Sequence, residues 1–199
     1  MSSRRTATPV YGLVLAGGES RRMGRDKAKL RRGEDSQLSY VVNLLEAQLE
    51  RVFVSTRSEQ SDDSERSRFA QIVDRFSDMG PVAGILSAVA EYPDVDWLVV
   101  ACDLPNIDEA TISYLLEHRS ADKPFTAFSS THDGLPEPLC AVYASNSAEI
   151  VRAFVDEGIH CPRKILIRSD SHLLTQPNPR SLDNVNTPDD LQGSVLAAP

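Results

Sequence analysis

The chain has 199 residues, of which 41% are hydrophobic, enough for a single domain with a sizeable core. Its 29 acidic and 21 basic residues give a net charge of −8, which argues against a general nucleic-acid-binding protein, because such domains are usually basic. No apolar run is long enough for a membrane span, and the three cysteines form no C-x-x-C pair. We therefore expect a cytoplasmic protein of one domain, residues 1–199, with frayed tails at 1–8 and 193–199.

Short apolar runs alternate along the chain with amphipathic runs of helical length. The apolar runs predict strands over residues 10–15, 51–55, 71–73, 97–101, 124–128 and 139–143. The amphipathic runs predict helices over residues 39–50, 82–91, 107–118 and 147–157, whereas the polar segment 60–68 predicts an exposed loop or helix edge. This alternation indicates an α/β, Rossmann-like fold with a mostly parallel, doubly wound sheet and helices on both faces.

The first predicted strand leads directly into Gly17 and Gly18, and a group of cations follows at Arg21, Arg22 and Lys27. Glycines allow a tight turn and bring backbone N–H groups close to a ligand, and cations suit a triphosphate. The spacing fits neither the P-loop nor the dinucleotide fingerprint. A surface loop with solvated arginines is the alternative interpretation of these residues.

Two acidic residues follow predicted strands, and ligands of such sheets bind at the carboxyl ends of the strands. Asp74 comes after strand 71–73, and Asp103 comes after strand 97–101. A carboxylate at a strand end is well placed to hold Mg²⁺, which uses few protein ligands. The alternative is that Asp103 caps the helix predicted to begin near Asp108. Gly84, within a predicted helix, indicates a close approach by another group.

Two later segments have both a structural and a functional interpretation. The run from Pro136 to Tyr143, with Pro138 inside it, is either a core strand or part of a ligand pocket. Thr187 and Pro188 form a helix start, which does not account for Asn184 and Asn186 before it.

Residues 15–27 read LAGGESRRMGRDK, which resembles the signature loop L-A-G-G-x-S-x-R-M-G-x-D-K of the molybdenum cofactor guanylyltransferase (MobA-type) family. The resemblance extends from Val10 to Leu191. It implies a nucleotidyltransferase (GT-A-like) architecture and a Mg²⁺-dependent transfer of GMP from GTP to the phosphate of molybdopterin or molybdenum-bound molybdopterin. The alternatives are a CTP-dependent cytidylyltransferase on the same acceptor, a nucleotidyltransferase on another phosphorylated acceptor, and a non-catalytic nucleotide-binding module.

The resemblance also assigns roles to individual residues. It implies catalytic roles for Arg22, Lys27 and Asp103, with Asp103 also holding the metal. It implies nucleotide binding by Leu15, Ala16, Gly17, Gly18, Lys27, Ser55, Asp74 and Asp103, and acceptor binding by Pro138, Tyr143, Asn184 and Asn186. Ser55 stands where the family often carries an asparagine that helps to hold the guanosine. Proteins that deliver or receive the cofactor are further expected partners, whereas nucleic acid and membranes are not.

Overall fold

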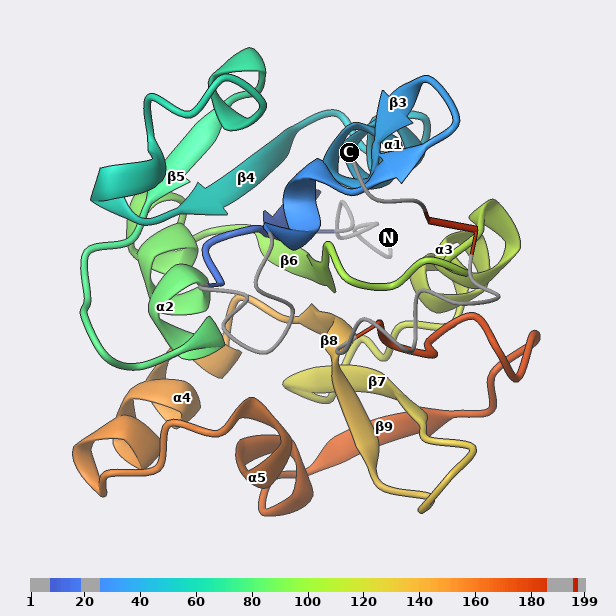
Figure 1. The fold of residues 1–199 in the computed structure, drawn as a ribbon. Coiled ribbons are helices and arrows are strands. Elements are labelled where there is room, and N and C mark those ends of the chain that lie inside the picture. The colour runs from blue at the N-terminus through green and yellow to red at the C-terminus, as the bar shows by residue number, and fades with distance from the viewer. Residues whose placement is uncertain (1–7, 19–25, 186–194, 197–199) are drawn as a thin grey trace, which may run out of the picture.

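A seven-stranded sheet forms the centre of the protein (Figure 1). The computed structural model describes residues 8–18, 26–185 and 195–196. Across the sheet the order is β5-β4-β1-β6-β8-β7-β9. The strands are β1 (Val10–Leu15), β4 (Val52–Thr56), β5 (Gln71–Val73), β6 (Asp96–Ala101), β7 (Phe125–Ser129), β8 (Pro136–Tyr143) and β9 (Ser171–Leu174). A separate two-stranded ribbon pairs β2 (Arg31–Arg32) with β3 (Asp35–Ser36).

The predicted mostly parallel sheet is confirmed, with one reversed strand. β1 pairs in parallel with β4 and β6, β4 with β5, and β7 with β9. β8 is antiparallel to both β6 and β7. It begins at Pro136, three residues earlier than predicted, and its pairing with β7 shifts register between Ala127 and Phe128. Pro138, which cannot donate a ladder hydrogen bond, lies at this irregularity and before the first residue that pairs with β6.

Helices cover both faces of the sheet, as predicted. They are α1 (Gln37–Glu46), α2 (Pro81–Glu91), α3 (Glu109–Glu117), α4 (Ser147–Asp156) and α5 (Pro162–Ile167). Residues of α1 and α3 share one apolar cluster with Val14 and Val100, whereas residues of α2, α4 and α5 share another with Leu13 and Val99. Because side chains alternate along a strand, both faces of β1 and β6 are buried. Among the described residues, no helix has the length and apolarity needed to cross a bilayer.

The predicted boundaries shift where a capping residue decides them. α1 begins two residues earlier than predicted because the Ser36 hydroxyl accepts a hydrogen bond from the Ser39 N–H. α3 begins after Asp108, whose carboxylate accepts one from the Thr111 N–H. α5 and β9 were not predicted. The described residue Leu196, expected within a frayed tail, is instead buried against Leu30 and Val185.

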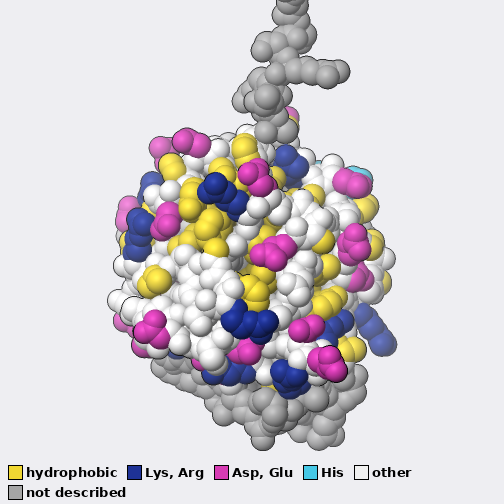
Figure 2. Space-filling model, turned by 90° about the horizontal axis from the view of Figure 1, so that it is seen from above, with side chains coloured by type: hydrophobic (Ala, Val, Ile, Leu, Met, Phe, Trp, Pro, Cys, Tyr) yellow, Lys and Arg dark blue, Asp and Glu magenta, His cyan; other side chains and the backbone are white. Residues whose placement is uncertain are grey.

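On the face shown in Figure 2, Lys and Arg side chains are interspersed with Asp and Glu, and apolar side chains lie between them. Opposite charges placed side by side in this way weaken the local potential. The negative net charge of the chain is therefore not gathered into one large acidic surface among the described residues of this face.

The turn into α2 explains two glycines. Gly80 has φ +57°, a backbone conformation that favours glycine, and Pro81 occupies the first turn of the helix. At Gly84 a Cβ would overlap the Ser55 hydroxyl and lie 3.1 Å from both Ser55 Cβ and Leu15 Cδ2. The close approach predicted for Gly84 is therefore an approach of α2 to the end of β4.

We predict that Gly84→Ala lowers the free energy of unfolding by about 1 to 3 kcal/mol, because the added methyl overpacks this contact. The gain in helix propensity, about 1 kcal/mol, does not offset the overlap with β4. Urea denaturation of the two proteins measures the difference. Gly18→Ala is the control, because no atom of the described residues lies within 4 Å of a Cβ at Gly18. Equal stabilities of Gly84→Ala and the unsubstituted protein would contradict the prediction.

Candidate active site

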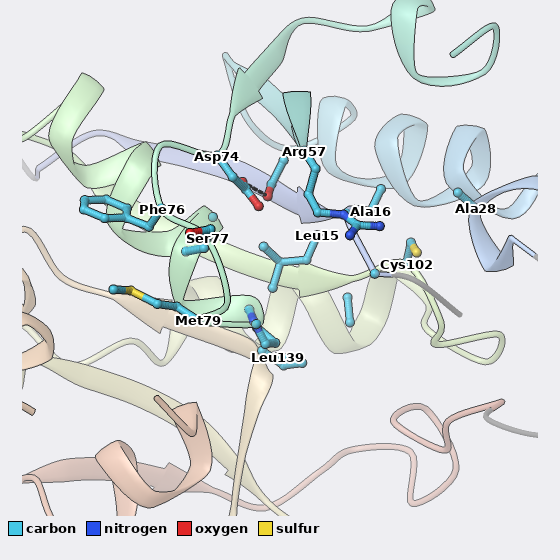
Figure 3. Close-up of a pocket in the computed structure, with 18 of the residues that line it drawn as sticks. Leu15, Ala16, Ala28, Arg57, Asp74, Phe76, Ser77, Met79, Cys102 and Leu139 are labelled. Carbon is cyan, nitrogen blue, oxygen red and sulfur yellow. Dashed lines mark hydrogen bonds between the residues drawn. The ribbon is translucent and has the colours of Figure 1, made fainter. Parts of the chain in front are cut away.

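A cavity of about 620 Å³ lies at the edge of the sheet where the parallel strands end (Figure 3). The segments after β1, β4, β5 and β6 and the first turn of α2 line it. This edge brings together the three segments that the sequence placed at strand ends. The predicted site residues that line the cavity are Leu15, Ala16, Gly17, Gly18, Lys27, Ser55, Asp74 and Asp103.

A second cavity, of about 350 Å³, adjoins the first. Ala101, Asp103 and Leu139 line both cavities. The second is also lined by Pro138 and Asn184, two of the predicted acceptor residues. The site therefore offers two neighbouring compartments, and the Asp103 carboxylate lies where they meet.

Tyr143, a predicted acceptor contact, does not line either cavity. The side chain is 1% exposed and its hydroxyl donates a hydrogen bond of 3.0 Å to the Pro138 carbonyl. Burial raises the pKa of this hydroxyl above its ordinary value. The reason is its place along β8: Tyr143 pairs with Trp97 at the start of β6 and packs on Phe125, whereas Pro138 lies at the opposite end of β8, beside the cavity.

Lys27 and Asp103 form an ion pair across the site, with 2.9 Å between Lys27 Nζ and Asp103 Oδ2. The two side chains are 16% and 22% exposed, so solvent screens the pair only partly. The structure excludes the capping interpretation of Asp103, because α3 is capped by Asp108. The Asp103 carboxylate is thus left to the cavities, while its backbone carbonyl accepts a hydrogen bond from the Val185 N–H.

Asp74 and Ser55 form a second polar group in the first cavity. The Ser55 hydroxyl donates a hydrogen bond of 2.8 Å to Asp74 Oδ1, shown by the dashed line in Figure 3. Burial raises the pKa of the Asp74 carboxyl, although the Ser55 hydrogen bond and the charge of Arg57 partly oppose the shift. A Cβ on Gly17 would lie 3.6 Å from Asp74 Oδ2, so Gly17, within the signature segment 15–27 (the glycine loop), lies directly beside this carboxylate.

Cys102 lies next to Asp103 but is 7% exposed, and burial raises the pKa of its thiol to about 12. A thiol with this pKa stays protonated near neutral pH and is a poor nucleophile. Among the described residues there is also no group of three or more His, Cys, Asp or Glu side chains that could hold a metal ion by themselves.

Two functional candidates were missed by the sequence patterns. Arg163, in the first turn of α5, lines the second cavity and pairs with Glu137 at 2.8 Å and Asp133 at 3.0 Å. Arg66 lies in the segment predicted to be an exposed loop or helix edge, yet its side chain is 1% exposed. Neither residue belongs to a periodic pattern or a motif, so only the tertiary contacts reveal them. Arg22 and Asn186 lie outside the described residues, and their predicted roles stay predictions.

The fold and the site together define a nucleotide-binding transferase of the α/β class. The glycine loop follows β1, an inner strand of the sheet, two compartments meet at one carboxylate, and a lysine lies beside it. Residues 12–172 match the family model described as "MobA-like NTP transferase domain", and the chain belongs to this family.

Individual relatives agree with this assignment. The chain is 37% identical over 183 residues to the "Molybdenum cofactor biosynthesis bifunctional protein" of Synechocystis, a match that covers 92% of the chain but only 53% of that relative. It is 34% identical over 191 residues to the "Probable molybdenum cofactor guanylyltransferase" of Mycobacterium avium, covering 94% of the chain and 95% of the relative. The crystal structure of "Molybdopterin-guanine dinucleotide biosynthesis protein A" from Archaeoglobus fulgidus superposes with a TM-score of 0.74 at 25% identity, over 92% and 95% of the two chains.

The raised pKa of Asp74 gives a prediction for stability against pH. A carboxyl whose pKa is higher in the folded than in the unfolded state favours folding at low pH, and this contribution is lost as the pH rises through the folded pKa. Asp74→Asn cannot ionise but keeps an acceptor for Ser55. We therefore predict that the variant gains stability relative to the unsubstituted protein between about pH 4 and about pH 7.

Urea denaturation across this pH range measures the effect. Ser55→Ala is the comparison variant, because it removes the hydrogen bond that favours the charged carboxylate and should steepen the loss of stability with pH. A stability difference between Asp74→Asn and the unsubstituted protein that does not vary with pH would contradict the prediction.

Proposed function

We propose that the protein transfers GMP from GTP to the terminal phosphate of molybdopterin, or of molybdenum-bound molybdopterin, giving the guanine dinucleotide and pyrophosphate. The observation that carries the proposal is the place of Asp103, on the wall shared by two cavities and in contact with Lys27 of the glycine loop. A transfer between two phosphates needs both substrates side by side with their reacting atoms at one charged centre. The family and the names of the relatives support this reaction.

The first cavity is the proposed nucleotide site. The backbone from Leu15 to Gly18 holds the nucleotide, and Lys27 together with Arg22 neutralises the triphosphate and the leaving pyrophosphate. Asp74, oriented by Ser55, accepts hydrogen bonds from the nucleoside. A carboxylate suits guanine, whose Watson–Crick edge carries N–H donors, better than the acceptor-rich edge of cytosine.

The second cavity is the proposed acceptor site, with Pro138, Asn184 and Asn186 as acceptor contacts. Arg163, which pairs with Glu137 and Asp133, brings a positive charge to a wall that also carries the carboxylate of Asp103. An anionic acceptor needs such a cation, because two carboxylates alone would repel it. Tyr143 acts on this site only indirectly, by holding the Pro138 carbonyl.

Mg²⁺ fits this arrangement, and we propose Asp103 as its protein ligand. Magnesium is held by one or two carboxylates together with substrate phosphates and water, so the site needs no cluster of protein ligands. When bound, the ion would neutralise charge on the phosphate oxygens. The paired Lys27 supplies a second positive charge at the same place.

The chemistry requires no covalent enzyme intermediate. An oxygen of the acceptor phosphate attacks the α-phosphorus of GTP, the new P–O bond forms, and the bond to the β-phosphate oxygen breaks in line, releasing pyrophosphate. The chain supplies position and charge stabilisation, consistent with a protonated, buried Cys102 that offers no nucleophile. We place the reaction in the cytoplasm. We also propose that residues 1–199 form one domain and that proteins delivering or receiving the cofactor are further partners.

The test is a matrix of four nucleoside triphosphates, each with and without molybdopterin, in which pyrophosphate release is measured in the presence of Mg²⁺. We predict the highest kcat/KM with GTP and release that depends on the acceptor. Equal or better turnover with CTP would favour the cytidylyltransferase and overturn the guanylyl assignment. If turnover occurred only with another phosphorylated compound, that compound would be the acceptor in place of molybdopterin. Saturable binding of GTP without turnover would indicate the non-catalytic module.

We predict that Asp103→Asn lowers kcat/KM by roughly 100-fold or more, because the near-isosteric amide removes the charge at the reacting phosphates. Its activity should also lose its dependence on Mg²⁺ concentration, whereas GTP binding without metal should change less. Asp170→Asn is the control, since this exposed carboxylate pairs with Lys123 and lines neither cavity. If Asp103→Asn kept full activity with an unchanged Mg²⁺ requirement, Asp103 would be excluded as the metal ligand, and Asp74 would be the next candidate.

A further inference from the structure

Arg66 is a charged side chain in the interior of the protein, outside both cavities, and the proposed reaction assigns it no role. It is 1% exposed and belongs to a short 3₁₀ helix, Arg66–Arg68, that precedes β5. Transferring a guanidinium from water into a protein interior is costly unless every donor is satisfied. The groups that accept hydrogen bonds from Arg66 therefore indicate its role in the structure.

The guanidinium joins the two ends of the glycine loop. At the first end, Arg66 Nε and Nη2 donate hydrogen bonds of 3.1 and 2.7 Å to the Ala16 carbonyl. At the second end, Nη1 and Nη2 donate to the two carboxylate oxygens of Asp26 at 2.7 and 3.0 Å. A two-pronged contact of this kind fixes orientation as well as distance. One side chain thus holds the residues that bound segment 17–25.

The second end of the loop carries the lysine. Asp26 Oδ1 also accepts a hydrogen bond of 3.1 Å from the Ala28 N–H and so caps the 3₁₀ helix Lys27–Lys29. Lys27 is the first residue of this helix, and its Nζ contacts Asp103. The orientation of Asp26 therefore sets the backbone from which Lys27 reaches the site.

Asp63 and Lys29 complete a network with balanced charge. Arg66 Nη1 donates to Asp63 Oδ1 at 3.2 Å, and Lys29 Nζ lies 2.5 Å from Asp63 Oδ2. Two carboxylates and two cations cancel, so Asp26 adds no net negative charge beside a bound triphosphate. Loss of Arg66 would therefore leave Asp26 both misplaced and unneutralised next to Lys27.

We propose that Arg66 is a positioning residue for nucleotidyl transfer, which closes the glycine loop by holding Ala16 and Asp26 together and so aims Lys27 at the triphosphate. The inference rests on the proposed function, because it takes the loop as the site of the nucleotide. A purely structural arginine would affect stability alone, whereas this arrangement couples Arg66 to the use of the nucleotide through Asp26.

The test compares Arg66→Lys, Asp26→Asn and the double variant. Lysine keeps the charge but cannot contact Ala16 and Asp26 in the same fork geometry, whereas asparagine keeps a capping acceptor for Ala28 but loses half of the carboxylate contact. We expect each single variant to lower kcat/KM for GTP by about 100-fold, with the KM of the acceptor unchanged. Because both act through one contact, the double variant should lose no more than the worse single variant.

Hydrogen exchange gives a readout that does not depend on turnover. Each variant should exchange faster in the peptide covering residues 26–30, where the amides of Ala28, Lys29 and Leu30 are hydrogen-bonded at this end of the loop. Arg119→Lys is the control, because Arg119 lies near Asp96 at the opposite end of β6. It should leave both kcat/KM and exchange at 26–30 unchanged, even where its thermal stability falls.

The outcomes separate the two proposals. Unchanged kcat/KM and unchanged exchange at 26–30 in a folded Arg66→Lys variant would overturn the role of Arg66, as would strict additivity with Asp26→Asn. If Arg66→Lys does not fold, Asp26→Asn alone decides by the same two measurements. If the unsubstituted protein shows no transfer to molybdopterin, the proposed function fails. The role of Arg66 then stands or falls on exchange at 26–30 and on whether GTP protects the variants less than the unsubstituted protein against heat.

Discussion

The parallel alignment of β1 between β4 and β6 is the constraint on which the rest of the site depends. Leu15, the last residue of β1, lies opposite Ser55 on one side and Ala101 on the other. Because parallel strands end at the same edge, this register delivers the glycine loop, the Ser55–Asp74 pair and Asp103 to one place from three distant parts of the sequence. The lysine at the end of the loop then meets the acid at the end of β6.

Because both faces of the sheet are buried, its strands could be predicted from the sequence. Continuous apolar runs such as residues 97–101 predict strands covered on both sides, and the confirmed α/β fold follows from their alternation with helices. Asp74 and Asp103 were found because position at a strand end is itself a local signal. Tyr143 could not be placed in the same way, since the reversal of β8 and its irregular pairing with β7 arise only from tertiary contacts. Arg66 was missed because its polar surroundings in the sequence resemble those of an exposed loop, while its partners lie 40 and 50 residues away.

The charged side chains of the site fall into two groups, one that lines the cavities and one that is buried behind them. Lys27, Asp103, Arg163 and Glu137 face the cavities, where substrates and water can reach them. Arg66 lies behind the loop, with its donors occupied by protein oxygens. The charges that line the cavities are thus distinct from those that hold the backbone, and Asp26 links the two groups.

The close approach of α2 to β4 has a consequence for attempts to redesign the proposed nucleotide site. Gly84 leaves no room between the helix and Ser55, and Ser55 is 2% exposed beneath Asp74. A larger amide side chain at position 55, such as the asparagine that the resemblance described above implies there, therefore requires a different position for α2 and for Gly80 and Pro81 at its start. The end of β4 and the start of α2 together shape this part of the cavity, so transferring its shape to another protein requires transferring both elements.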